Sequence, residues 1–84
     1  MRILATVLEK DLTLEQRQAV VKLLSNYEAD ALLTVREKVI NMKSILGLCS
    51  LVLEQGDSIE VRTFGYDEDE ALQAVKEFLH PQHT

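Results

Sequence analysis

Two hydroxyl side chains, Thr13 and Ser44, stand where helices are predicted to begin. A helix start leaves backbone N–H groups without partners, and a side-chain oxygen at that position can accept a hydrogen bond from them. Each has this structural role, because Thr13 forms a capping-box pattern with Gln16 and Ser44 is a suitable N-cap for the apolar run 45–49. Threonine is a poor nucleophile without a neighbouring base, so no catalysis is expected at Thr13.

The remaining polar side chains do not form a recognisable catalytic or metal site. His80 and His83 make an H-x-x-H pair around Pro81, but they lie in a polar tail without further ligands, which predicts a frayed terminus and no metal site. The acidic runs 9–11 and 67–70 are typical of turns and helix starts. Because there is no Ser/His/Asp grouping and no glycine-rich phosphate loop, the chain is predicted not to be an enzyme and to need no cofactor.

The composition predicts one small, soluble, acidic domain. A chain of 84 residues with 46% hydrophobic content fits a single core. The formal net charge of -5 opposes binding to the phosphate backbone of nucleic acids and to anionic lipids. Cys49 is the single cysteine, so it forms no internal disulfide, and no apolar run approaches the length of a membrane span. We therefore expect no nucleic-acid partner, no membrane partner and a reducing, cytoplasmic location.

Hydrophobic periodicity divides the chain into seven elements in the order β-α-β-β-α-β-α. Four segments alternate as strands do and three carry an apolar helical face: strands at 2–8, 29–35, 39–42 and 58–63, and helices at 13–27, 45–49 and 67–79. Because every strand alternates, the sheet is predicted to be antiparallel, with helices covering one face and water on the other.

Two connections in this scheme have a specific expected geometry. The hairpin turn at 36–38 contains no glycine or asparagine, so we expect a connection looser than the two-residue turn with positive φ. Asp67 and Glu70 are expected to open the last helix together, as a capping pair.

The first strand has an aliphatic side chain at nearly every position. Ile3, Ala5 and Val7 share one face, which supports a strand. Leu4 and Leu8 share the other face, and we expect them on the open side of the sheet, where they would form a possible dimer contact.

Three blocks of sequence resemble the C-terminal half of the HPr phosphocarrier family: Asn41-Met42-Lys43-Ser44-Ile45-Leu46-Gly47-Leu48, Gln55-Gly56-Asp57 and Asp67-Glu68-Asp69-Glu70-Ala71-Leu72. The resemblance implies an open-faced sandwich of the α+β class, in which three helices lie on one face of a four-stranded antiparallel sheet. This fold agrees with the element order obtained from periodicity. We expect the HPr-like domain to span residues 1–79, followed by a polar tail at 80–84.

The resemblance also implies that the phosphocarrier site is missing. HPr proteins carry phosphate on a histidine that starts the first helix and is followed by alanine, arginine and proline. Aligned without gaps, these positions hold Thr13, Leu14, Glu15 and Gln16. Glu15 replaces the arginine that would bind phosphate, and its like charge disfavours an incoming phosphoryl group. Exchange of phosphate at Thr13 is therefore not expected.

The serine block, in contrast, matches the family. In Gram-positive members a dedicated kinase phosphorylates a serine before the short helix, and the modified protein can bind a catabolite repressor. That serine corresponds to Ser44, and the resemblance implies an apolar partner-binding patch beside it at Ile45, Leu46, Leu48 and Cys49. The expected partner is a protein, such as a serine kinase or a transcriptional regulator.

Three functions stay open at this point, and the favoured one is a regulatory, protein-binding paralogue without phosphocarrier activity. A second is a phosphocarrier with another acceptor, for which His80 and His83 are the candidates. A third is a structural or assembly domain that uses the open sheet face, to which Leu32 would add an apolar side chain. The oligomeric state does not follow from the sequence.

Overall fold

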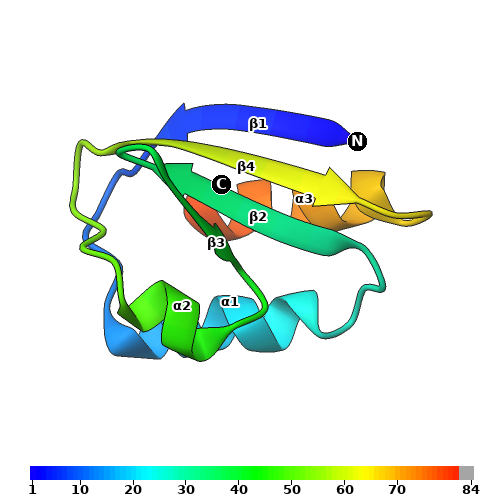
Figure 1. The fold of residues 1–84 in the computed structure, drawn as a ribbon, viewed down its shortest axis with the longest axis horizontal. Helices are drawn as coiled ribbons and strands as arrows, with labels where there is room; N and C mark the ends of the chain where they lie inside the picture. The colour runs from blue at the N-terminus through cyan, green and yellow to red at the C-terminus, as the bar shows by residue number, and fades with distance from the viewer. Residues whose placement is uncertain (82–84) are drawn as a thin grey trace.

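The computed structural model of the chain describes residues 1–81 and confirms the predicted fold class and element order. The elements are β1 (Arg2–Val7), α1 (Leu14–Leu24), β2 (Asp30–Val35), β3 (Lys38–Asn41), α2 (Ile45–Cys49), β4 (Ser58–Phe64) and α3 (Glu68–Leu79). The strands form one antiparallel sheet in the order β1-β4-β2-β3 (Figure 1). No helix within residues 1–81 has the length and apolar character needed to span a membrane.

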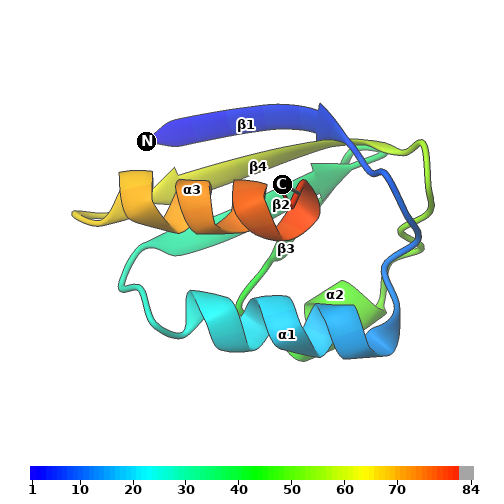
Figure 2. The same cartoon turned by 180° about the vertical axis from the view of Figure 1, so that it is seen from behind.

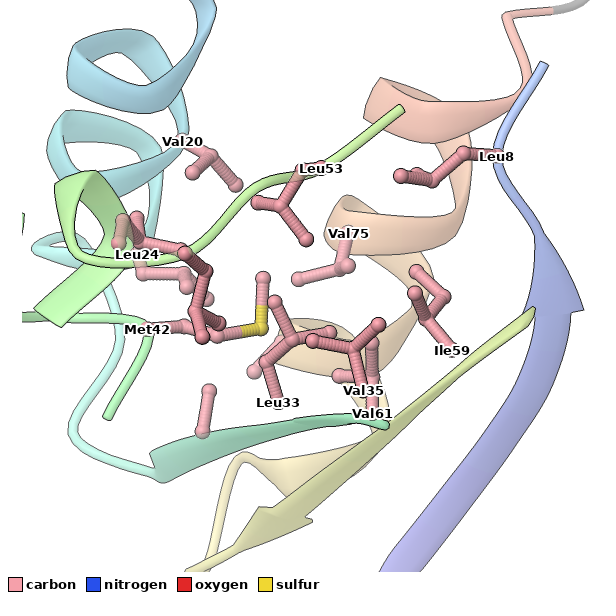
Figure 3. Close-up of a cluster of buried hydrophobic side chains, with 14 of the residues drawn as sticks. Leu8, Val20, Leu24, Leu33, Val35, Met42, Leu53, Ile59, Val61 and Val75 are labelled. Atoms are coloured by element: carbon pink, nitrogen blue, oxygen red, sulfur yellow. The ribbon is translucent and has the colours of Figure 1, made fainter. Parts of the chain in front are cut away.

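All three helices bury side chains against the same face of the sheet, which leaves the other face open. Figure 2 shows α3 in front of the strands, with α1 and α2 below it. Leu24 of α1 and Val75 of α3 point into one cluster with Leu33 and Val61 of the sheet (Figure 3). These four side chains are at most 2% exposed, so the core joins every layer of the fold.

The orientation of β1 is the reverse of the one expected. Leu4 lies opposite a buried residue of β4, and paired residues of antiparallel strands point to the same side of the sheet. Leu4 and Leu8 therefore face the helices, and Leu8 is only 3% exposed, whereas Ile3 and Val7 face outward and are 50% and 48% exposed. The expectation for Leu32 is confirmed, since it pairs with an exposed residue of β4 on the open face.

The β2–β3 turn is also tighter than expected. Arg36 and Glu37 alone connect the strands, with φ angles of 47° and 67°, and the residues on either side pair directly. Positive φ at two residues other than glycine is unfavourable, so another interaction must hold the turn. The Arg36 guanidinium supplies it by pairing with the Asp57 carboxylate at 2.9 Å and by donating to the carbonyl of Val52. The side chain thereby fixes the hairpin tip against the loop before β4.

Asp67 precedes α3 as expected, but its side chain does not cap that helix. The carboxylate is 8% exposed and accepts hydrogen bonds from the backbone N–H groups of Glu28 (2.9 Å) and Ala29 (2.8 Å). Burial would raise the pKa of the carboxyl group, but these hydrogen bonds outweigh burial and lower it. Asp67 thus joins the β4–α3 junction to the segment that enters β2, and the predicted pairing with Glu70 as a cap is wrong.

Candidate functional site

The hydroxyl of Thr13 is used within α1, as the predicted capping box requires. The Gln16 N–H donates to Thr13 Oγ1 at 3.1 Å, and the Thr13 N–H donates to Gln16 Oε1 at 3.0 Å. Two of the backbone donors at the helix start are therefore satisfied by side chains of the chain itself. A phosphate at this position would compete with both bonds.

Arg17, which the sequence analysis did not single out, lies in the first turn of α1, and its guanidinium is already occupied. It donates to the backbone carbonyls of Leu12 (3.1 Å), Leu48 and Leu51 (2.6 Å). Leu48 lies in the last turn of α2 and Leu51 two residues beyond its end, where backbone carbonyls attract positive charge. Arg17 therefore joins the start of α1 to the end of α2.

Replacing Arg17 by methionine, which keeps much of the aliphatic stem, is expected to lower the free energy of unfolding by about 2 kcal/mol. The loss follows from removing the guanidinium that binds the carbonyls of Leu48 and Leu51, of which Leu48 keeps a 3.3 Å bond from the Leu51 N–H. Amide hydrogen exchange in α2 should accelerate more than exchange in α3. Lys22→Met, an exposed substitution on the same helix, serves as the control and should change neither measurement appreciably. Unchanged exchange in α2 of the Arg17→Met variant would show that Arg17 does not hold the two helices together.

Ser44 occupies the predicted N-cap position of α2. Its Oγ accepts a hydrogen bond from the Gly47 N–H at 3.1 Å, and its own N–H donates to the Asn41 carbonyl at 3.0 Å. The residue is partly exposed. Lys43 is turned toward the end of α1, where its Nζ donates to the Tyr27 carbonyl at 2.7 Å.

Thr13 and Ser44 lie at opposite ends of the paired helices α1 and α2. Arg17 connects the start of α1 with the end of α2, while Lys43 connects the start of α2 with Tyr27, just beyond the end of α1. The two candidate residues therefore do not form one composite site.

The apolar patch implied beside Ser44 is only partly a surface. Leu46 is 82% exposed and Cys49 is exposed, whereas Ile45 is partly buried. Leu48 is fully buried, because it occupies the face of α2 that packs into the core, so the assignment of Leu48 to the partner contact is wrong. Leu48 therefore packs beneath the patch and cannot contact a partner.

Two further apolar side chains, Leu14 and Val52, extend the exposed surface toward Thr13. They are 59% and 61% exposed and line a shallow groove between the start of α1 and the loop after α2, which we call the α1–α2 groove. Carboxylates of Asp11 and Glu54 border the same groove. The surface therefore combines an apolar centre with acidic neighbours, a composition suited to contact with a protein.

His80 is packed against β1, which corrects the expectation of a frayed end at that residue. Its Nε2 lies 2.7 Å from Thr6 Oγ1, and its Nδ1 lies 3.2 Å from a carboxylate oxygen of Glu9. Its backbone N–H donates to the carbonyl of Lys76 in the last turn of α3, so His80 is hydrogen-bonded to that helix. His83 lies outside the described residues. Within residues 1–81, no three metal-ligating side chains come together.

Comparison with known sequences identifies relatives along most of the chain. A family model described as the PTS HPr component phosphorylation site matches residues 6–80. Over 59 residues the chain is 36% identical to the phosphocarrier protein HPr of Xylella fastidiosa, a match that covers 70% of this chain and 66% of that protein. The chain thus spans slightly less than two thirds of the length of this curated relative.

Solved structures agree with the observed fold. The HPr-C-His structure from Thermoanaerobacter tengcongensis superimposes with a TM-score of 0.87, at 25% identity, over 94% of this chain and 91% of that one. The Bacillus subtilis protein Crh superimposes with a TM-score of 0.76, at 29% identity, over 86% of this chain and 83% of that one. Crh is described there as a catabolite repression containing protein that forms a dimer with a swapping domain.

Proposed function

Because this chain belongs to the HPr family of the phosphotransferase system, we propose that it is a regulatory, protein-binding member of that family without phosphocarrier activity. It would act in the cytoplasm through the surface that runs from Ser44 along the α1–α2 groove. The partner would be a serine kinase, a transcriptional regulator or another protein of this regulatory class.

The state of the α1 start is the observation that carries this proposal. A transferable phosphate requires a nucleophile and a free cation beside the helix N-terminus. Here the Thr13 hydroxyl oxygen accepts the Gln16 N–H, and the Arg17 guanidinium is bound to backbone carbonyls. Glu15 is exposed in the first turn and adds a negative charge. These contacts support a helix-capping role for this position and argue against phosphate exchange there.

Ser44 supports the regulatory part of the proposal. The residue is partly exposed at the start of α2, and the strongly exposed Leu46 follows it two positions later. A phosphate on Ser44 would lie beside an apolar surface, so modification would change the charge of a patch that a partner can contact. The structural likeness to Crh, described as a catabolite repression protein, also favours a regulatory role.

The proposal predicts that a serine kinase that phosphorylates HPr proteins, when supplied with ATP, adds one phosphate to the chain at Ser44. Intact-protein mass spectrometry should show this single addition, and Ser44→Ala should abolish it. Ser50→Ala is the matched control, because Ser50 is an exposed serine at the other end of α2. Loss of the N-cap in Ser44→Ala costs about 1 kcal/mol, so circular dichroism must first show that the variant is folded. Absence of labelling under conditions that modify a true HPr would contradict the regulatory proposal.

A second arm of this test concerns the phosphocarrier activity. With phosphoenolpyruvate and the general phosphotransferase enzyme, the chain should acquire no acid-labile phosphate, and neither should Thr13→His, because Glu15 and the occupied Arg17 remain. Acid-labile phosphate on the unmodified chain, at His80 for example, would show that it is a carrier. Transfer to Thr13→His at a rate like that of HPr would show that the α1 start is still competent to bind phosphate.

A further inference from the structure

A hydroxyl group of β1 lies beside an imidazole and a carboxylate where α3 ends. Helix α3 runs alongside β1 and ends near the end of that strand (Figure 2). Thr6 Oγ1 lies 2.7 Å from His80 Nε2, and His80 Nδ1 lies 3.2 Å from a carboxylate oxygen of Glu9. Thr6 and His80 are 74 residues apart in the chain, so the fold brings them together. These three side chains, which we call the Thr6 cluster, have the order of a nucleophile, a base and a group that orients the base.

The Thr6 cluster provides what a threonine needs to react as a nucleophile, which is a neighbouring base. A carboxylate beside Nδ1 favours the imidazole tautomer that carries its proton on Nδ1. In that tautomer Nε2 is unprotonated and accepts the hydrogen bond from the Thr6 hydroxyl, at a distance suited to proton transfer. Thr6 is partly buried and the His80 side chain is 26% exposed, so the pair is shielded from much of the solvent.

A cavity of about 240 Å³ adjoins the Thr6 cluster. Glu9 of the cluster lines it, and so does Leu79, which directly precedes His80. Leu8 adds a second aliphatic wall, and it lies on the same side of the sheet as Thr6 because side chains two residues apart on a strand share a face. The cavity is smaller than the pockets that hold drug-sized ligands, so it suits a short aliphatic chain.

The residue after Thr6 offers a backbone donor for the oxygen of an attacked carbonyl group. The Leu8 N–H donates to the carbonyl of Asp57, just before β4, and peptide groups alternate in direction along a strand. The Val7 N–H therefore points away from β4, which is the one strand that pairs with β1 within residues 1–81. In hydrolases with a serine nucleophile, the N–H of the residue after the nucleophile stabilises this oxygen. The Val7 N–H is the candidate for the same role.

We propose that Thr6 is an acylation site that accepts a short acyl group from a thioester. The Thr6 oxygen attacks the thioester carbonyl carbon, and its proton passes to His80 Nε2. The carbon–sulfur bond then breaks, the departing thiolate takes the proton from His80, and an ester on Thr6 remains. Lys10, which also lines the cavity, places a positive charge where the negatively charged sulfur leaves. The site uses neither Ser44 nor the α1–α2 groove, so it is independent of the function proposed above.

The test exposes the full chain to a small thioester, the butyryl ester of N-acetylcysteamine, and follows butyryl groups by mass spectrometry with fragmentation. We expect one butyryl group on Thr6, which alkaline hydroxylamine removes and neutral hydroxylamine does not. An acyl group on the exposed Cys49 is removed by neutral hydroxylamine, and an amide on Lys10 resists both treatments, so the three products are distinguishable. Acylation confined to cysteine and lysine side chains would overturn the proposal.

Thr34 is the internal control for reactivity, because it is a partly exposed threonine on the open face of the sheet, away from His80. In the unmodified chain Thr6 should be acylated at least tenfold faster than Thr34, because a base accelerates its reaction. Equal rates at the two hydroxyl groups would contradict the proposal, and this comparison needs no variant to fold.

Variants of the cluster test the base and its orientation. His80→Gln should lower the rate of Thr6 acylation roughly a hundredfold. Glu9→Gln should lower it less, because the carboxylate acts through His80. Acylation of Cys49 measures the reactivity of the thioester in every sample and should be the same in both variants. Circular dichroism shows whether each variant is folded. An unchanged rate at Thr6 in folded His80→Gln would show that His80 is not the base.

Discussion

Replacing Gly65 by alanine is expected to destabilise the domain by roughly 3 kcal/mol or more. Gly65 has a φ of 144°, a region that residues with a side chain rarely adopt. An added Cβ would also lie 2.8 Å from the backbone Cα of Ala29. Ala29 is fully buried and its N–H is bound to Asp67, so it cannot move away without breaking that contact. Chemical denaturation at equilibrium measures the loss.

Gly56→Ala is the matched control for this prediction. Gly56 also has a positive φ, of 91°, but an added Cβ would meet nothing within 4 Å. The control therefore contains the conformational cost without the collision, and we expect a loss of about 1 kcal/mol. Equal losses in the two variants would show that the close approach of Gly65 to Ala29 contributes nothing.

Asp67→Ala is expected to lower the midpoint of thermal unfolding by roughly 10 °C. The substitution removes the acceptor of two backbone N–H groups, those of Glu28 and Ala29, and the latter residue is fully buried. Glu70→Ala is the control, because Glu70 is an exposed acidic residue in the first turn of the same helix. We expect its midpoint to change by about 2 °C at most. A comparable loss in Glu70→Ala would restore the capping role predicted for that residue.

The contribution of Asp67 should also depend on pH. Its pKa is lowered in the folded chain, so the folded state binds this proton less readily than the unfolded state does. The stability that Asp67 supplies is therefore complete above the unfolded pKa and is lost as the pH falls through the folded pKa. The difference in stability between the unmodified chain and Asp67→Ala should be constant near neutral pH and shrink below about pH 4. A difference that grows in acid would contradict this assignment.

Periodicity was sufficient to predict the element order, because each strand alternates and each long helix has one apolar face. It could not orient β1, where Ile3 and Leu4 are both aliphatic and either face could enter the core. The register with β4 decides this, and register depends on residues far away in the chain. The turn at Arg36 and Glu37 was missed for a similar reason, since its unfavourable φ angles are tolerated through a salt bridge to the distant Asp57.

The candidate site shows the same limit. The capping roles of Thr13 and Ser44 are local patterns and were predicted correctly. The role of Arg17 was not predicted, because its acceptors include Leu48 and Leu51, which lie 31 and 34 residues further along the chain. The sequence also could not show that Leu48 is buried and Leu46 exposed. Helix α2 has five residues, which is too short for a clear periodic pattern.

The strand order has a consequence for synthesis on the ribosome. β1 is translated first, yet its one neighbour in the sheet, β4, is translated sixth among the seven elements. The adjacent strands β2 and β3 can form their hairpin as soon as both have emerged, whereas β1 has to wait with its aliphatic residues unpaired. The nascent chain therefore leaves β1 without its partner for longer than any other strand, and unpaired strand edges favour misassembly.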